Sequence, residues 1–100
     1  GAVMLELKDF MPINFLKKEK FTGSHKGMRF QMEKVEAEGE EKPKLGVTVW
    51  PEPYGYDATP DSEKEKVLFD FNADGLAQGV DWVNQQFEAQ AGRWKAASLR

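Results

Sequence analysis

The chain has one histidine, His25, and no cysteine among its 100 residues, which leaves few of the usual catalytic groups. A nucleophilic triad or a histidine-based metal site would have to be built around this single imidazole. Its neighbours Ser24 and Lys26 are adjacent in sequence, where side chains diverge instead of forming a nucleophile and base pair. We therefore expect His25 to lie on the surface of a turn, and we predict that the protein is not an enzyme and has no catalytic residue, metal site or cofactor.

Other patterns that could bind or transfer phosphate are weak. Neither a GxxxxGK[ST] nor a GxGxxG sequence is present, so the commonest phosphate-binding loops are absent. Residues 23–27 still combine glycines, free amides and a lysine, which are the ingredients of a weak anion site. With the basic residues around them, they give the candidate anion-binding or nucleic-acid-binding residues Lys17, Lys18, Lys20, Ser24, His25, Lys26 and Arg29.

A proline-rich stretch is the second place where recognition chemistry could occur. Residues 51–61 contain three prolines and a glycine; Trp50 directly precedes this stretch, and Tyr54 and Tyr56 lie within it. Aromatic rings with a polar group are favoured at interfaces, although the same rings could fold back and cover an open sheet face. Trp82 lies about 120° from the apolar stripe of its helix, so it should sit at the helix edge, against the N-terminal segment or a second copy. The candidate partner-binding residues are Trp50, Tyr54, Tyr56 and Trp82.

Three strands are predicted from the alternation of apolar and polar residues. Their apolar positions are Met28, Phe30 and Met32, then Leu45, Val47 and Val49, then Val67, Phe69 and Phe71. Pro51 ends the second strand because it lacks a backbone donor. The polar residues 21–27 predict a turn, and the acidic residues 36–44 predict an exposed connection.

A helix follows the third strand. Its apolar stripe recurs every three or four residues, at Leu76, Val80, Val83 and Phe87, and the same angle reaches Trp94. Asn72 is a suitable N-cap, and Asp74 suits the positive end of the helix. Nine apolar residues between positions 4 and 21 predict a segment with one or two short helical turns that docks on the core.

These elements predict an α+β fold: a three-stranded antiparallel meander packed against a C-terminal helix, with a short helical N-terminal segment. We expect a single domain over residues 1–100, with a docking segment at 4–21, the sheet at 28–71, the helix at 73–91 and a tail at 93–100. The longest apolar run is far shorter than the roughly 20 residues that cross a bilayer. We expect a cytoplasmic protein with no membrane partner.

Nucleic acid is the less favoured partner because the net charge is −3, although residues 1–30 carry +3 and residues 31–72 carry −6. The order helix, three strands, helix resembles the double-stranded-RNA-binding domain, but that family has lysines at the start of its last helix, where this chain has Asn72-Ala73-Asp74-Gly75. Three strands and a helix also resemble the sheet-type DNA-binding domains of phage integrases. That resemblance requires basic outward side chains, whereas Arg29, Gln31, Glu33, Thr48, Trp50, Leu68 and Asp70 include one cation and two acids.

The stretches FTGSHKGMR (21–29), VWPEPY (49–54) and ATPD (58–61), with the helix from residue 74 to 87, resemble a group of small bacterial proteins of about this length that have no established activity. The resemblance implies a cytoplasmic bacterial protein and no particular chemistry. From the residues, we predict a small non-enzymatic protein-binding or adaptor module that uses the aromatic and proline loop, with a homodimer as one form of partner. The alternative is a nucleic-acid-associated protein that uses the basic segment 17–29.

Overall fold

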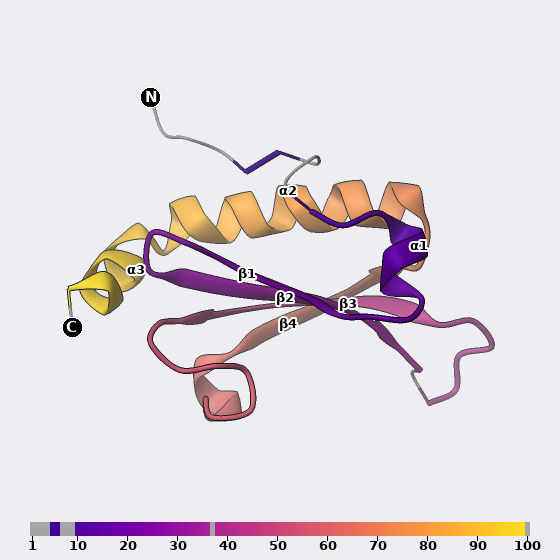
Figure 1. Cartoon of the computed structure of the whole chain (residues 1–100), viewed down its shortest axis with the longest axis horizontal. Coiled ribbons are helices and arrows are strands. Elements are labelled where there is room, and N and C mark those ends of the chain that lie inside the picture. Colours follow the sequence, from indigo (N-terminus) through magenta and orange to yellow (C-terminus); the bar gives the residue numbers. More distant parts are fainter. Residues whose placement is uncertain (1–4, 7–9, 37, 100) are drawn as a thin grey trace.

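The computed structural model of the chain describes residues 5–6, 10–36 and 38–99. It contains an antiparallel sheet with a long helix along one face, so the predicted α+β class is confirmed (Figure 1). The predicted number of three strands is wrong, since the sheet has four. In chain order the elements are α1 (Ile13–Leu16), β1 (Phe21–His25), β2 (Met28–Val35), β3 (Lys44–Pro51), the 3-10 helix η2 (Asp61–Glu63), β4 (Glu65–Asp70), α2 (Ala73–Ala89) and α3 (Ala91–Ser98).

The additional strand, β1, occupies the residues for which the sequence predicts a turn. It pairs antiparallel with β2, with Phe21 opposite Met32. The turn itself is confined to Lys26 and Gly27, whose φ angles are 47° and 94°. Two successive positive φ angles are typical of the tight turn that matches the twist of paired strands. The hairpin therefore needs only two residues outside its strands.

Gly23 explains why β1 was hidden in the sequence. A Cβ at this position would lie 2.6 Å from the Cζ atom of Phe30, so the ring occupies the space that a side chain would take. Strand alternation would place an apolar side chain at position 23, but the residue there is glycine. The Phe30 ring of the neighbouring strand occupies that part of the core.

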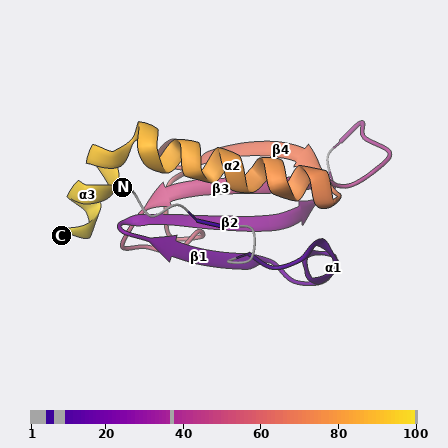
Figure 2. The same cartoon turned by 90° about the horizontal axis from the view of Figure 1, so that it is seen from above.

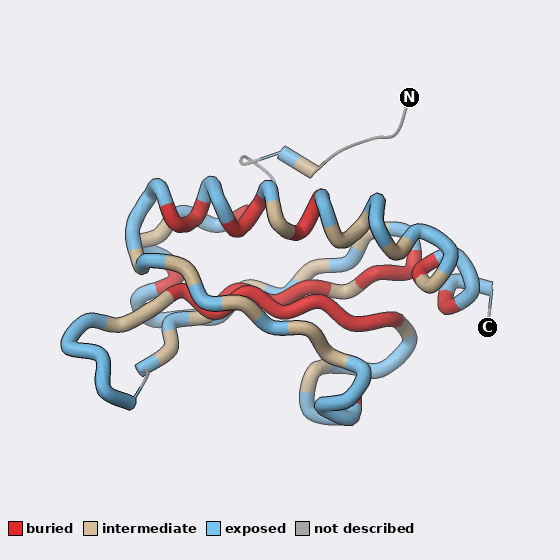
Figure 3. The backbone as a smooth tube through the Cα atoms, turned by 180° about the vertical axis from the view of Figure 1, so that it is seen from behind, coloured by how far each residue is buried: buried red, intermediate tan, exposed pale blue. Residues whose placement is uncertain are grey.

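The sheet order is β1-β2-β3-β4, which confirms a meander of consecutive antiparallel strands. Phe30 lies opposite Val49 and Val47 opposite Val67, so the predicted apolar positions of the strands share one face. Burial is greatest in β2, in β3 and on the side of α2 that faces them (Figure 3). The buried sheet residues on this face are Met28, Phe30, Met32, Leu45, Val47 and Val49.

Helix α2 lies across this apolar face (Figure 2). Its predicted N-cap is confirmed, because the Asn72 side chain accepts a hydrogen bond of 2.7 Å from the Gly75 amide. The predicted stripe is also confirmed, with Leu76, Val80 and Val83 buried. A Cβ on Gly79 would lie 3.1 Å from a methyl group of Val47, so the glycine lets the helix lie close to the sheet.

The chain does not end in the predicted tail. Gln90 has φ −120° and ψ 30°, which ends α2, and the residues after it form α3. Trp94 on α3 is buried, and its Nε1 donates to the Gln86 carbonyl oxygen at 3.0 Å. A Cβ on Gly27 would meet the Trp94 carbonyl oxygen at 1.9 Å, so α3 packs directly on the β1–β2 turn.

The N-terminal segment contributes to the core. Phe10 and Leu16 are buried. The backbone of Leu5 is held on α2 by the Asn84 side chain, which accepts from the Leu5 amide at 2.9 Å and donates to the Leu5 carbonyl oxygen at 2.8 Å. Two of the apolar residues expected to dock, Met4 and Leu7, lie outside the described residues.

Candidate functional site

The proline-rich connection between β3 and β4 lies on the side of the sheet away from α2 (Figure 1). We call residues 52–64 the aromatic loop. Trp50, at the end of β3, is fully buried, and its Nε1 donates to the Tyr54 carbonyl oxygen at 2.8 Å. The Tyr56 ring meets the Trp50 indole edge-on at 5.6 Å. Trp50 therefore anchors the loop and is not an exposed ring, so the expectation of a patch formed by all three loop aromatics is wrong.

Side chains within the aromatic loop hold it further. The Thr59 hydroxyl donates to the Gly55 carbonyl oxygen at 2.8 Å. Lys64 donates to the Tyr56 carbonyl oxygen at 3.0 Å, and its ammonium also lies 3.9 Å from the centre of the Tyr56 ring. These contacts fix the loop through its own carbonyl groups, in place of the ladder bonds of a strand.

Tyr54 is the aromatic side chain that this arrangement leaves outside. Its side chain is 63% exposed, although its carbonyl oxygen is bound by the buried Trp50 indole. Tyr56 is partly buried. Trp82, on α2, is also partly buried and packs against the core. Of the four candidate partner-binding residues, only Tyr54 presents most of its ring to solvent.

His25 ends β1, and its ring centre lies 4.7 Å from that of Phe87 on α2. It is therefore a partly buried strand residue that contacts the helix, and not the surface turn residue that we expected. Over residues 5–6, 10–36 and 38–99, no group of three or more His, Cys, Asp or Glu side chains is arranged to hold a metal ion.

The candidate anion-binding residues are divided between different parts of the sheet. Lys26 is in the β1–β2 turn, at one end of β1. The lysines that precede β1 lie at its other end, in a shallow depression lined by Leu16, Lys17, Lys18, Glu19, Lys20, Glu33 and Lys34. Lys34 is a member of this group that the sequence analysis missed, because it is distant in sequence and reaches the depression only through the pairing of β1 with β2.

Arg29 lies elsewhere again, on the sheet face away from α2. Its strand neighbours are Ser24 on β1 and Trp50 on β3. The side chain is partly buried, and its Nε atom is shielded from solvent without a hydrogen-bond partner. Ser24 is exposed beside it. The basic segment 17–29 therefore does not form one continuous surface.

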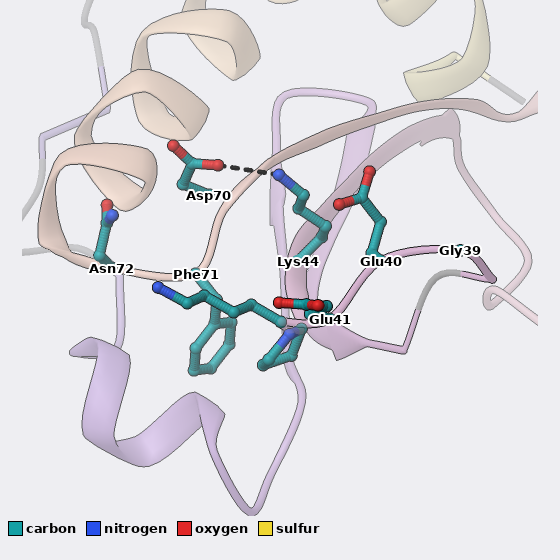
Figure 4. A pocket seen from close by; sticks show the side chains of 9 residues that line it. Gly39, Glu40, Glu41, Lys44, Asp70, Phe71 and Asn72 are labelled. Carbon is teal, nitrogen blue, oxygen red and sulfur yellow. Dashed lines mark hydrogen bonds and ion pairs between the residues drawn. The ribbon is translucent and has the colours of Figure 1, made fainter.

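A second depression lies where the 38–43 connection meets the start of α2 (Figure 4). Lys44 donates to the Asp70 carboxylate at 2.9 Å, and Figure 4 shows the Glu40 carboxylate on the opposite side of the Lys44 side chain. The hydrogen bond to Asp70 raises the pKa of Lys44, and the negative charges of Asp70 and Glu40 raise it further. A raised pKa favours the protonated amine, which cannot act as a nucleophile or general base.

Comparison of the chain with protein-family models, with curated proteins and with solved structures gives no match. None of the described helices has the length and apolar character needed to cross a membrane.

Proposed function

We propose that the chain is a non-enzymatic protein-binding module and that Tyr54 is the aromatic residue that its partner contacts. The observation that carries the proposal is the contrast within one residue: the Tyr54 side chain is 63% exposed, while its carbonyl oxygen is bound by the buried Trp50 indole. The proposal keeps the cytoplasmic location expected from the sequence.

Physical chemistry favours binding by a ring that is displayed in this way. An exposed tyrosine offers a large apolar face and a hydroxyl group, and it has only two rotatable side-chain angles to immobilise. The loop beneath it is already ordered by Trp50, Thr59 and Lys64. Ordering a loop at the moment of binding weakens association, so a loop that is ordered in advance strengthens it.

The test is a comparison of partner sets between matched variants. Wild-type chain, Tyr54→Ala and Leu99→Ala are immobilised and incubated with lysate of the source organism, and retained proteins are quantified by mass spectrometry. Leu99 is a suitable control because its side chain is 77% exposed in the C-terminal region and belongs to no part of the loop. We expect at least one protein to be retained by wild type and Leu99→Ala and to fall about tenfold or more with Tyr54→Ala, as for an aromatic hot spot.

Identical retention by all three chains would contradict the proposal. Sedimentation of the purified protein covers the case in which the partner is a second copy. A dimer that is present in wild type and Leu99→Ala and lost in Tyr54→Ala identifies the homodimer as the bound form.

A nucleic-acid function is the second candidate, because Lys17, Lys18, Lys20 and Lys34 line one depression. Glu19 and Glu33 lie among them and lower the local positive potential. Phosphate-driven binding weakens steeply with salt. We would titrate mixed DNA and RNA oligonucleotides at low and high salt; amide shifts confined to the lysine depression and lost at high salt would favour this function over protein binding.

A further inference from the structure

Arg29 stands apart from the other cations of the sheet because its charge is uncompensated. Lys66 forms an ion pair with Glu33 at 3.1 Å, and Lys44 pairs with Asp70 at 2.9 Å. Within the part of the chain that the structure describes, the Arg29 side chain forms no ion pair and no hydrogen bond. A partly buried guanidinium without a partner loses hydration without compensation, so an unpaired donor in such a position calls for an explanation.

The residues beside Arg29 do not pair with it. Glu52 comes nearest among the acids in the strand register, because its amide donates to the Gly27 carbonyl oxygen at 3.0 Å, but its carboxylate forms no ion pair with a described residue. Ser24 and Trp50 are its neighbours across the sheet. Gln31 follows it on the same face, but its Oε1 atom accepts from Thr22 and its Nε2 atom donates to Glu33. The amide is therefore occupied, and the acid beyond it is already paired with a lysine.

The guanidinium has one accessible side. Nε is the Arg29 atom that is shielded from solvent, and the terminal nitrogens Nη1 and Nη2 are not among the shielded atoms. These two nitrogens can bind the two oxygens of a carboxylate end-on, in the paired geometry that makes arginine–carboxylate contacts strong.

We infer that Arg29 is the anion-binding residue of a carboxylate site on the sheet face away from α2, and that its ligand is a glutamate or aspartate side chain of the partner protein. This inference deepens the proposed function and rests on it. A single carboxylate is favoured over a polyphosphate chain because the strand neighbours Ser24 and Trp50 carry no positive charge and the lysines of residues 17–20 lie beyond the other end of β1.

Trp50 links Arg29 to Tyr54. Trp50 is opposite Arg29 in the sheet, and its indole holds the carbonyl oxygen of Tyr54. A partner segment that contacts the Tyr54 ring can therefore place an acidic residue on Arg29. The segment that fits is a short acidic stretch beside a residue that packs on tyrosine.

The experiment uses the arginine side-chain Nε–H signals of the 100-residue chain, which contains three arginines, Arg29, Arg93 and Arg100. The probes are an acetylated and amidated Gly-Glu-Gly peptide, the matching Gly-Gln-Gly peptide and inorganic phosphate. We expect a saturable shift of the Arg29 signal with Gly-Glu-Gly at millimolar concentration and no shift with Gly-Gln-Gly. Arg93 is an internal control, because its Nη1 is already bound to Glu65 at 2.9 Å.

Arg29→Lys keeps the positive charge but cannot bind both carboxylate oxygens in the paired geometry, so it should weaken binding of Gly-Glu-Gly about tenfold. Binding to this variant is measured from the backbone amide shifts of Ser24 and Gln31. Absence of a saturable Arg29 shift, or equal shifts with both peptides, overturns the inference. A shift with phosphate and none with Gly-Glu-Gly overturns the assignment to a protein carboxylate. The peptide titration involves only Arg29, and the retention experiment involves only Tyr54. If Tyr54→Ala loses the partner but Gly-Glu-Gly does not shift the Arg29 signal, the proposed function stands and the Arg29 inference fails.

Discussion

At the residue scale, we expect the Arg29 guanidinium to lower the stability of the fold while it serves ligand binding. A guanidinium that is partly buried without a partner has lost hydration that no interaction replaces. Replacing it with an apolar side chain of similar length removes that cost and keeps the packing of its methylene groups. Arg29→Met should therefore raise the free energy of unfolding by about 0.5–1 kcal/mol while abolishing carboxylate binding.

Urea unfolding of wild type and Arg29→Met measures this difference. Lys66→Met is the matched comparison, because it removes a lysine that is paired with Glu33 and should be neutral or destabilising. A loss of more than about 1 kcal/mol in Arg29→Met would indicate that the guanidinium has a structural partner, and it would contradict the binding role.

We also expect Lys44 to make the free energy of unfolding depend on pH. Its pKa is raised in the folded state, first by its hydrogen bond to Asp70. A group with a raised folded pKa contributes stability that is complete below its unfolded pKa, near 10.4, and is lost as the pH rises through the folded value. Unfolding measured between pH 8 and 12 should therefore show a smaller alkaline loss of stability in Lys44→Gln than in wild type. If the free energies of unfolding of wild type and Lys44→Gln fall in parallel with rising pH, the expected contribution of Lys44 is absent.

At the scale of the element, the contact of α2 with the sheet depends on glycine. A Cβ on Gly75 would lie 1.8 Å from the Asp70 carbonyl oxygen, which is backbone and cannot move aside. A Cβ on Gly92, in α3, would have no neighbouring atom within 4 Å. Gly75→Ala should cost about 1–3 kcal/mol through overpacking, whereas Gly92→Ala should gain about 0.5–1 kcal/mol from helix propensity.

Thermal unfolding followed by circular dichroism tests the pair, since the two substitutions are chemically identical. Stabilisation by Gly75→Ala would show that the start of α2 can move away from β4. Equal effects at the two positions would show that the contact itself has no influence.

The same elements show how far sequence reasoning reaches. The α2 stripe and the Asn72 cap were predictable because periodicity and capping are local signals. Strand β1 was not predictable, because Gly23 stands where strand alternation would place an apolar side chain, and the Phe30 ring of β2 fills that space. α3 was missed because its buried side follows from contacts with the β1–β2 turn and not from a strong stripe of its own.

For the candidate site, the sequence offered Tyr54 as a partner-binding residue and Arg29 as an anion- or nucleic-acid-binding residue, without their arrangement. It gave Trp50 the same role as Tyr54, whereas the fold buries the Trp50 ring and makes it the anchor of the aromatic loop. Trp50 is buried because the aromatic loop returns across the sheet. Arg29 has no ion pair with a described residue, partly because Glu33, an acid on the same strand, pairs with Lys66. Both are properties of the tertiary structure.

At the scale of the whole molecule, α3 closes the end of the sheet from which the β1–β2 turn projects. Trp94 is buried, its indole binds the Gln86 carbonyl oxygen, and its own carbonyl oxygen lies against Gly27. A chain that ends at residue 90 would lose this large buried ring and expose the end of the core beside the β1–β2 turn.

Loss of a buried tryptophan costs about 3–5 kcal/mol, a large part of the 5–15 kcal/mol that stabilises a typical domain. The chain that ends at residue 90 should therefore unfold at a much lower urea concentration than the full chain. A chain that ends at Ser98 keeps every described contact of Trp94 and should match the full chain. Unfolding is followed by far-ultraviolet circular dichroism, which remains comparable when a tryptophan is removed. Equal midpoints for the chains ending at residue 90 and Ser98 would show that α3 is an appendage, and that the sheet and α2 form the cooperative unit without it.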